Sequence, residues 1–145
     1  MNCELCSTDG GALLWRNADC RVVSIEEAGY PGFCRVIWNA HVKEMTDLTA
    51  PERDRFMRVV FETEAALREL LGPDKVNLAS LGNVTPHLHW HVIPRFLDDP
   101  HFPNPVWSAA VRPAAPSGRA VADLPKAIAA RLSRLRTDPR PIGKM

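Results

Sequence analysis

The chain has 145 residues, of which 46% are hydrophobic, so it is long enough to bury one core but short for several domains. Its 18 basic and 17 acidic side chains leave a formal net charge of +1, which excludes a global attraction to nucleic acid or to an anionic membrane. The residues MNCELCSTDG contain no basic stretch followed by an apolar run, and no run of about 18 apolar residues occurs in the sequence. We therefore expect a compact cytoplasmic protein without disulfides, with no nucleic-acid or membrane partner.

Three short strands are predicted in the N-terminal part of the chain. Strand-like patterns cover Ala12–Arg16 and Asp19–Ile25, which a turn at Asn17 joins. A third strand is predicted at Cys34–Trp38, after the turn-forming sequence Tyr30-Pro31-Gly32.

One long amphipathic helix is predicted to begin near Thr49 and to end at Gly72-Pro73. Thr49 and Glu52 form a capping box, with Pro51 in the first turn. Residues at three- and four-residue spacing give the helix one apolar stripe, so we expect it to pack on the core. The stripe comprises Phe56, Val59, Val60, Thr63, Leu67, Leu70 and Leu71, and the residues expected to face away are Arg53, Arg58, Glu62 and Arg68.

The remaining elements are separated by turn signals. Lys75–Leu81 is predicted as a strand, Gly82-Asn83 as a turn, and His87–Pro94 as a further strand. Five prolines exclude regular structure between residues 97 and 118, and so long a loop in a small domain is often functional. A second helix is predicted at Asp123–Arg136, with Asp123 as its cap. It would pack through Leu124, Ile128, Leu132 and Leu135, while Arg131, Arg134, Arg136, Arg140 and Lys144 form a solvated basic face and tail.

Three histidines occupy alternate positions of the last predicted strand. Alternate side chains of an extended strand share a face, so His87, His89 and His91 should project together at intervals of roughly 6.6 to 7 Å. The apolar residues between them would face the core. A neutral imidazole can attack with its free nitrogen, and a protonated one can donate to a phosphate oxygen. Imidazoles are also metal ligands, and an exposed strand can carry a polar face, so the residues alone leave all three interpretations open.

The segment His87-Leu88-His89-Trp90-His91-Val92-Ile93 resembles the motif of the histidine-triad (HIT) superfamily over its whole length. The surroundings are similar too, with an early Cys3-x-x-Cys6 pair, one long helix and a Gly-Asn turn before the triad, a likeness that covers roughly residues 1–107. It implies an α+β fold: a mostly antiparallel sheet of about five strands, one long helix packed on it, a short C-terminal helix, and a homodimer. We expect the HIT domain to span residues 1–118, followed by a helix and tail at 119–145.

The resemblance also implies roles for particular residues. His89 would attack the α-phosphorus and form a nucleotidyl-histidine, which water or another acceptor resolves. His91 and His87 would orient the nucleophile, bind phosphate oxygens and assist the leaving group. Asn83 and Thr85 lie where the family places phosphate-binding residues, although Asn83 replaces the usual glutamine.

The activity implied is that of a nucleotide hydrolase or nucleotidyl transferase similar to the diadenosine polyphosphate hydrolases. Its substrate would be a dinucleoside polyphosphate or a nucleoside phosphoramidate, and its chemistry requires no cofactor. Many family members carry a relay histidine after the Pro-Gly turn, whereas Pro31-Gly32 is followed here by Phe33. That departure favours the alternative interpretation, a noncatalytic metal- or nucleotide-binding module.

Cys3 and Cys6 have the spacing of a metal knuckle, but one such pair is a weak signal. In some HIT proteins a similar pair joins two histidines in a structural zinc site, which would correspond to His41 and His87. Free thiols are the alternative, and zinc would compete with phosphate for His87. Cys20 and Cys34 lie within predicted strands and read as small buried apolar residues.

Three residues after the triad carry open interpretations. Arg95 can hold phosphate, meet a neighbouring subunit or lie on the surface. His101 and Trp107 belong to the proline-rich loop, which can cover the cleft or pack against a partner. The resemblance further suggests that the walls of a nucleoside pocket come from Leu5, Ile25 and Val36.

Overall fold

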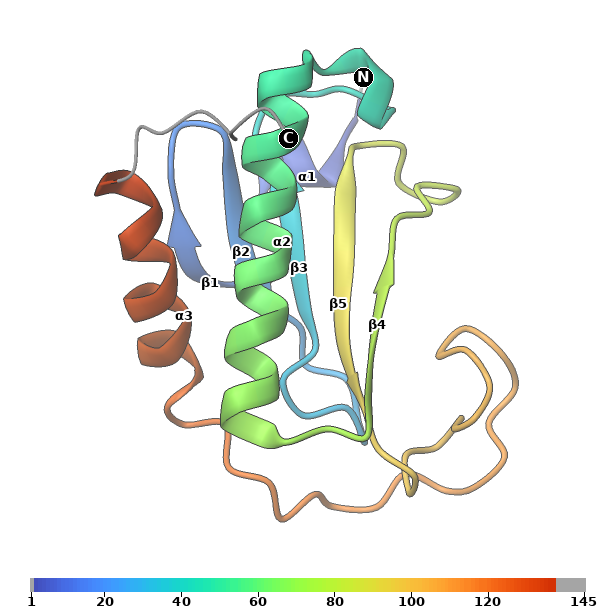
Figure 1. Ribbon diagram of the computed structural model, residues 1–145. Coiled ribbons are helices and arrows are strands. Elements are labelled where there is room, and N and C mark those ends of the chain that lie inside the picture. Colours follow the sequence, from blue (N-terminus) through green and yellow to red (C-terminus); the bar gives the residue numbers. More distant parts are fainter. Residues whose placement is uncertain (1, 138–145) are drawn as a thin grey trace.

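The protein is described by a computed structural model that defines residues 2–137 and contains one antiparallel sheet with the strand order β1-β2-β3-β5-β4 (Figure 1). The strands are β1 (Ala12–Arg16), β2 (Cys20–Ser24), β3 (Cys34–Trp38), β4 (Lys75–Ala79) and β5 (His89–Arg95). The helices are α1 (Glu4–Ser7), η1 (Met45–Asp47), α2 (Ala50–Leu71), α3 (Leu124–Ser133) and η2 (Arg134–Thr137). This arrangement confirms the predicted α+β architecture.

Helix α2 packs on one face of the sheet and buries the main core there. Its capping box forms as predicted, with the Thr49 hydroxyl accepting from the Glu52 amide, and Gly72 ends the helix in a left-handed conformation at φ 56°. Phe56 is fully buried and packs edge-on against Trp38 of β3. Helix α3 packs against α2 and β1 and adds Leu124, Ile128 and Leu132 to the same core. Leu70, Leu71 and Leu135 are only partly buried.

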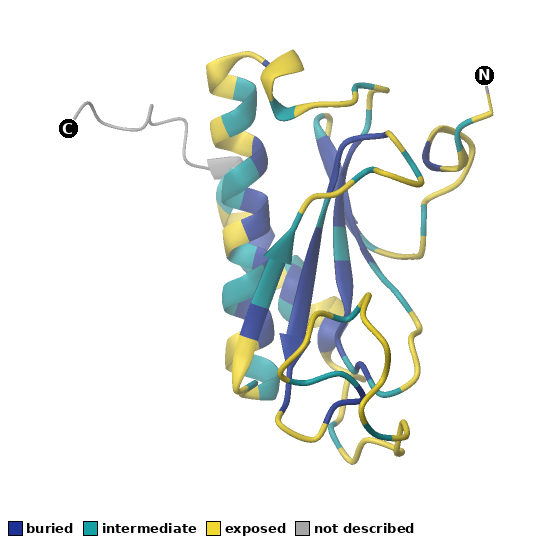
Figure 2. Cartoon of the chain, turned by 90° about the vertical axis from the view of Figure 1, so that its right-hand side faces the viewer, coloured by how far each residue is buried: buried dark blue, intermediate teal, exposed yellow. Residues whose placement is uncertain are grey.

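The other face of the sheet is covered by irregular chain instead of a long helix. Figure 2 shows α2 on one side of the sheet and the N-terminal segment with α1 on the other. Leu5 of α1 packs there on Val23 and Ile37, and Ile93 packs with Tyr30 and Phe33 farther along. His89 and His91 lie on this face, since His89 is the strand partner of Ile37.

The predicted boundaries differ from the observed ones mainly near the site. Strands β1 and β3 lie where predicted, and β2 is one residue shorter at each end. The triad strand begins at His89 instead of His87, because His87 lies in a turn whose amide donates to the Thr85 carbonyl. Strand β4 ends at Ala79, and the short helices α1 and η1 were not predicted.

The C-terminal helix also departs from its prediction. It is α-helical only from Leu124 to Ser133, and Asp123 makes no side-chain capping hydrogen bond. Arg131 is not simply solvated, since it forms ion pairs with Glu62 at 2.6 Å and Glu69 at 3.0 Å. The predicted basic residues Arg140 and Lys144 lie outside the described residues. Within residues 2–137, no helix has the length and apolar character needed to cross a bilayer.

Candidate functional site

Strand β5 presents His89 and His91 on the face opposite α2. Their rings are 4.9 Å apart between centroids and meet edge to face. The intervening positions alternate as predicted, since Leu88 and Val92 are buried in the core beneath α2. Burial of the apolar residues therefore fixes the direction in which both imidazoles point.

The ring of His89 is held in one tautomer by the main chain. Its Nδ1 lies 2.6 Å from the carbonyl oxygen of His87. A carbonyl oxygen can only accept, so Nδ1 carries the proton and Nε2 keeps its lone pair. Burial lowers the pKa of His89, which keeps the ring neutral near pH 7. The result is an imidazole whose free nitrogen is available for attack.

His91 lies between two aromatic side chains. Its ring centroid is 5.9 Å from that of Phe33 and 5.0 Å from that of Trp107. Burial lowers the pKa of His91 to about 4. Its Nδ1 is buried and has no hydrogen-bond partner within the described chain. That nitrogen is orphaned beside Phe33, the position at which the resemblance leads one to expect a relay histidine.

The ring of His87 belongs to a different cluster from the edge-to-face rings of His89 and His91, although His87 and His89 line one cleft. Its Nε2 donates to the Trp38 carbonyl oxygen at 2.6 Å, so Nδ1 carries the lone pair. That Nδ1 lies 3.3 Å from Cys3 Sγ, 3.5 Å from Cys6 Sγ and 3.3 Å from His41 Nδ1. His87 therefore contacts the His89 ring through its carbonyl oxygen, while its own ring faces the cysteines.

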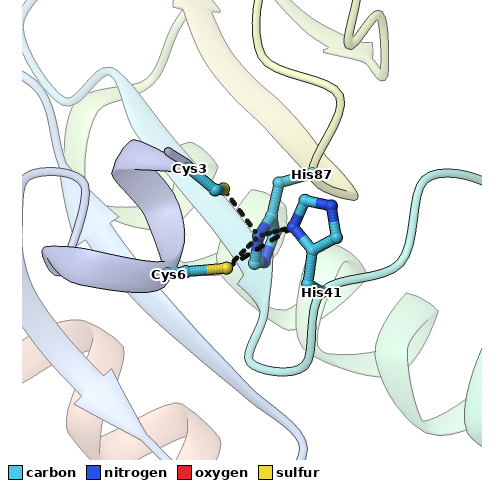
Figure 3. A group of neighbouring side chains, drawn as sticks. All are labelled: Cys3, Cys6, His41 and His87. Carbon is cyan, nitrogen blue, oxygen red and sulfur yellow. Dashed lines mark hydrogen bonds between the residues drawn. The ribbon is translucent and has the colours of Figure 1, made fainter. Parts of the chain in front are cut away.

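Cys3, Cys6, His41 and His87 converge on one point, as Figure 3 shows. Their four ligand atoms all lie within 4.8 Å of one another. A tetrahedron with Zn–N near 2.0 Å and Zn–S near 2.3 Å has edges of roughly 3.3 to 3.8 Å. The measured separations of 3.3 to 3.5 Å between cluster atoms match those edges. The thiol and imidazole donors are also those that zinc prefers.

Arg21 anchors the segment that carries the two cysteines. It is 3% exposed, and its guanidinium donates to the carbonyl oxygens of Leu5 at 2.5 Å, Thr8 at 3.2 Å and Asp9 at 3.0 Å. Its remaining hydrogen bond goes to the Asn39 side chain at 3.1 Å. A cation from β2 thus satisfies the carbonyls around α1 and holds the cysteines against the sheet.

The proline-rich loop is fixed by a buried ion pair. Arg95 donates from Nε and Nη2 to the Asp99 carboxylate at 2.7 and 3.0 Å, and both side chains are almost fully buried. Asp99 also accepts the amides of Phe96, His101 and Phe102. These donors hold the pKa of Asp99 at about 2 against the opposing effect of burial. Arg95 is therefore occupied within the chain, and the loop that it holds places Trp107 against His91.

The other predicted site residues are the two expected to bind phosphate and the three expected to form the walls of a nucleoside pocket. Asn83 is exposed and Thr85 half-buried, both on the loop between β4 and β5. Part of that loop, Ser80 to Gly82, lines a cleft of about 500 Å³ together with Lys43–Thr46 and His87–Trp90. Of the predicted pocket walls, Leu5 and Ile25 lie with Val23 and Ile37 on the histidine side. Val36 does not, because it points into the core beneath α2.

Two site residues were missed by sequence reasoning. Arg35 of β3 is the Cα partner of His91 of β5, so it lies beside the histidines on their face of the sheet. Asp99 escaped notice because its role depends on folding of the loop. The signal for Arg35 was present, since it is the one charged residue in the strand sequence Cys-Arg-Val-Ile-Trp.

A five-stranded antiparallel sheet that displays ordered imidazoles places this protein in the class of α+β domains with a histidine site. Solved structures agree. The fold is similar to that of histidine triad proteins from Bradyrhizobium japonicum (28% identity, 82% of this chain, 88% of that chain, TM-score 0.69) and Marinobacter aquaeolei (27%, 85%, 89%, 0.68). One from Sinorhizobium meliloti is similar as well (25%, 83%, 89%, 0.69).

Residues 11–98 match the family model described as HIT domain. The chain therefore belongs to the HIT domain family, whose members are commonly nucleotide-binding hydrolases or transferases. A search of curated protein sequences finds no match.

Proposed function

We propose that this protein is a nucleotide hydrolase or nucleotidyl transferase that acts at the α-phosphate through a covalent intermediate on His89. Its substrate is a dinucleoside polyphosphate or a nucleoside phosphoramidate. The observation that carries the proposal is the hydrogen bond from His89 Nδ1 to the His87 carbonyl, because it leaves Nε2 unprotonated and open to the substrate. Membership in the HIT family supports the reaction class.

The reaction takes place in two displacements. His89 Nε2 attacks the α-phosphorus and forms an N–P bond. The leaving group departs with the electron pair of its P–O or P–N bond, and an amine also takes up a proton from solvent as it leaves. Water then attacks the same phosphorus, the pair of the N–P bond returns to Nε2, and the nucleoside monophosphate and a proton are released. We assign His91, on the same face, to contact with phosphate oxygens. Asn83 and Thr85 remain assigned to phosphate binding.

A substrate panel tests this proposal. The protein is incubated with a dinucleoside polyphosphate, an adenosine phosphoramidate and an adenylated amine, each with radiolabel at the α-phosphate, and quenched rapidly in acid. We expect label on the wild-type chain and none on His89→Ala. Full activity in His89→Ala, or nucleotide binding without turnover of any substrate, would refute the proposal and favour the noncatalytic module.

We also propose that Cys3, Cys6, His41 and His87 hold a structural zinc ion, with no catalytic step assigned to it. The agreement between their separations and the edges of a zinc tetrahedron supports the site. Elemental analysis of protein purified without a histidine tag should give about one equivalent of zinc per chain. Less than roughly a tenth of an equivalent would exclude the site.

A homodimer is the partner state that we propose. Two features support it: β4 is an edge strand of the sheet, and Phe61 on α2 is 51% exposed. Light scattering after size-exclusion chromatography should give twice the chain mass of 16.1 kDa, and the mass of a single chain would exclude the dimer.

A further inference from the structure

The sheet places a positive charge directly beside the proposed catalytic histidines. Arg35 of β3 is the Cα partner of His91, and two positions farther along the same strand Ile37 is the partner of His89. Val23 of β2 lies on the other side of Arg35. Residues in such register share one face of a sheet, so Arg35 lies between the histidines and the apolar cluster formed by Leu5, Val23 and Ile37.

Arg35 differs from the two fully buried arginines of this face in having few partners. Arg21 and Arg95 each make several short hydrogen bonds within the chain. Arg35 is half-buried, and its Nε is buried without a partner in the described chain. Among residues 2–137 its side chain makes one hydrogen bond, a long contact from Nη1 to the Gly10 carbonyl at 3.4 Å. No ion pair within 4 Å neutralises it among residues 2–137.

A phosphate bound at His89 carries negative charge, which a neighbouring cation would stabilise. Burial keeps His91 neutral near pH 7, so that ring offers a hydrogen bond and no net charge. Arg95, the arginine nearest along the triad strand, is occupied by Asp99. Neighbouring strands are about 4.8 Å apart, and an arginine side chain is longer than that spacing, so the Arg35 guanidinium is within reach of a group held over the histidines.

We infer that Arg35 is a substrate-binding residue that donates to the phosphate oxygens of the nucleotide held at His89. The guanidinium fork matches two oxygens of a phosphate, and the loss of its hydration is partly complete before the ligand arrives, because Nε is already buried. The apolar cluster beyond Arg35 would then lie toward the nucleoside. This inference rests on the proposed function for the location of the phosphate.

The test compares a nucleoside with and without its phosphate. Calorimetry measures the affinity of AMP and of adenosine for wild type, Arg35→Met and Arg35→Lys. Loss of one charged hydrogen-bonding pair should weaken AMP binding by roughly 10- to 100-fold in Arg35→Met, with adenosine affinity changed by less than about 3-fold. Arg35→Lys, which keeps the charge without the fork, should lose less. Arg68→Leu, on the exposed side of α2, removes the same charge as a control.

The outcomes separate this inference from the proposed function. An equal loss of affinity for AMP and for adenosine would show that Arg35 contacts the nucleoside. Unchanged AMP affinity in both variants would show that Arg35 does not contact the nucleotide. Either result overturns the inference. Thermal unfolding checks that each variant is folded, and Arg35→Lys keeps the test valid if Arg35→Met is not. If the wild-type protein turns over no substrate but Arg35→Met still loses AMP binding selectively, the role of Arg35 is supported and the proposed catalysis is refuted.

Discussion

The protein has two pairs of neighbouring histidines, His41 with His87 and His89 with His91, and the ring orientation differs between them. In the cluster with Cys3 and Cys6, His87 donates from Nε2 to a carbonyl and turns Nδ1 toward the cysteines. On the sheet face, His89 donates from Nδ1 to a carbonyl and leaves Nε2 free. One main-chain acceptor per ring decides which nitrogen keeps its lone pair. In His87 that nitrogen faces two thiols, which suits the proposed metal ligand, whereas in His89 it is left without a partner in the described chain, which suits the proposed nucleophile.

His87 also connects the two regions. Its ring faces the cysteines, while its carbonyl oxygen orients His89. A metal ion at the cluster would therefore fix the nucleophile without touching the substrate, in the way that outer groups orient the reacting ones. If both proposals hold, this division between ring and main chain would remove the competition for His87 expected from the sequence.

The largest expected effect comes from removing the nucleophile alone. His89→Ala should lower turnover on the order of 10⁴-fold or more, because no other described group replaces a covalent nucleophile. Zinc content and thermal unfolding should match wild type, since the His89 ring makes no contact with the cysteines. Activity assays test the expected loss of turnover, and elemental analysis tests the unchanged zinc content. Retention of more than about a tenth of the activity in His89→Ala would contradict its assignment as the nucleophile.

Removing a cysteine should give the reverse pattern. Cys6→Ser should lower bound zinc to under about a tenth of an equivalent and lower the melting temperature, since metal binding contributes folding free energy. Activity should fall by less than about 10-fold, because the His87 carbonyl remains in the turn before β5. Cys20→Ala, which removes a buried cysteine that is not part of the cluster, serves as the control and should keep its zinc. Loss of activity as large as in His89→Ala would mean that the two regions are not separable.

The proline-rich loop supports the region around His89 and His91, and the buried Arg95–Asp99 ion pair fixes that loop. Removing the charge of Asp99 tests this support. Asp99→Asn leaves Arg95 buried without its counter-ion and should lower the free energy of unfolding by about 3–5 kcal/mol. Urea unfolding followed by circular dichroism measures it. The neighbouring Asp98→Asn, where the carboxylate is 75% exposed, should cost under about 1 kcal/mol. Equal effects would show that the Arg95–Asp99 pair does not hold the loop.

The smallest expected effect is a pH dependence that arises from His91. Its pKa is about 4 in the folded chain against 6.5 when exposed, so the unfolded chain binds more protons between these values. The stability due to the neutral ring is thus complete above pH 6.5 and is lost as the pH falls toward 4. At about pH 5 this loss amounts to about 2 kcal/mol relative to pH 8.

Comparison with His91→Phe isolates this contribution, because the other titrating groups are common to both proteins. Unfolding free energies at both pH values should show a steeper loss in wild type. Equal slopes would show that His91 is solvated and not enclosed by Phe33 and Trp107.

Much of the fold was predictable from local patterns. The capping box at Thr49, the stripe beneath α2 and the bounds of β1 and β3 depend on residues close together in the chain, and all appear in the structure. The predictions failed where distant segments decide the conformation. His87 lies in a turn before the strand, where its ring meets Cys3 and His41 from distant parts of the chain, and Val36, predicted as a pocket wall, is buried in the core beneath α2.

The sequence by itself predicted the sheet-and-helix architecture and the shared face of β5 on which His89 and His91 lie. Through family resemblance it also predicted which four side chains, Cys3, Cys6, His41 and His87, come together. Tertiary structure alone decided which nitrogen of each histidine is free, which arginines are already paired, and what encloses His91. The reason is physical: strand periodicity fixes a side chain's direction locally, whereas tautomers, pKa values and unpaired charges depend on carbonyls, rings and carboxylates brought from elsewhere in the chain.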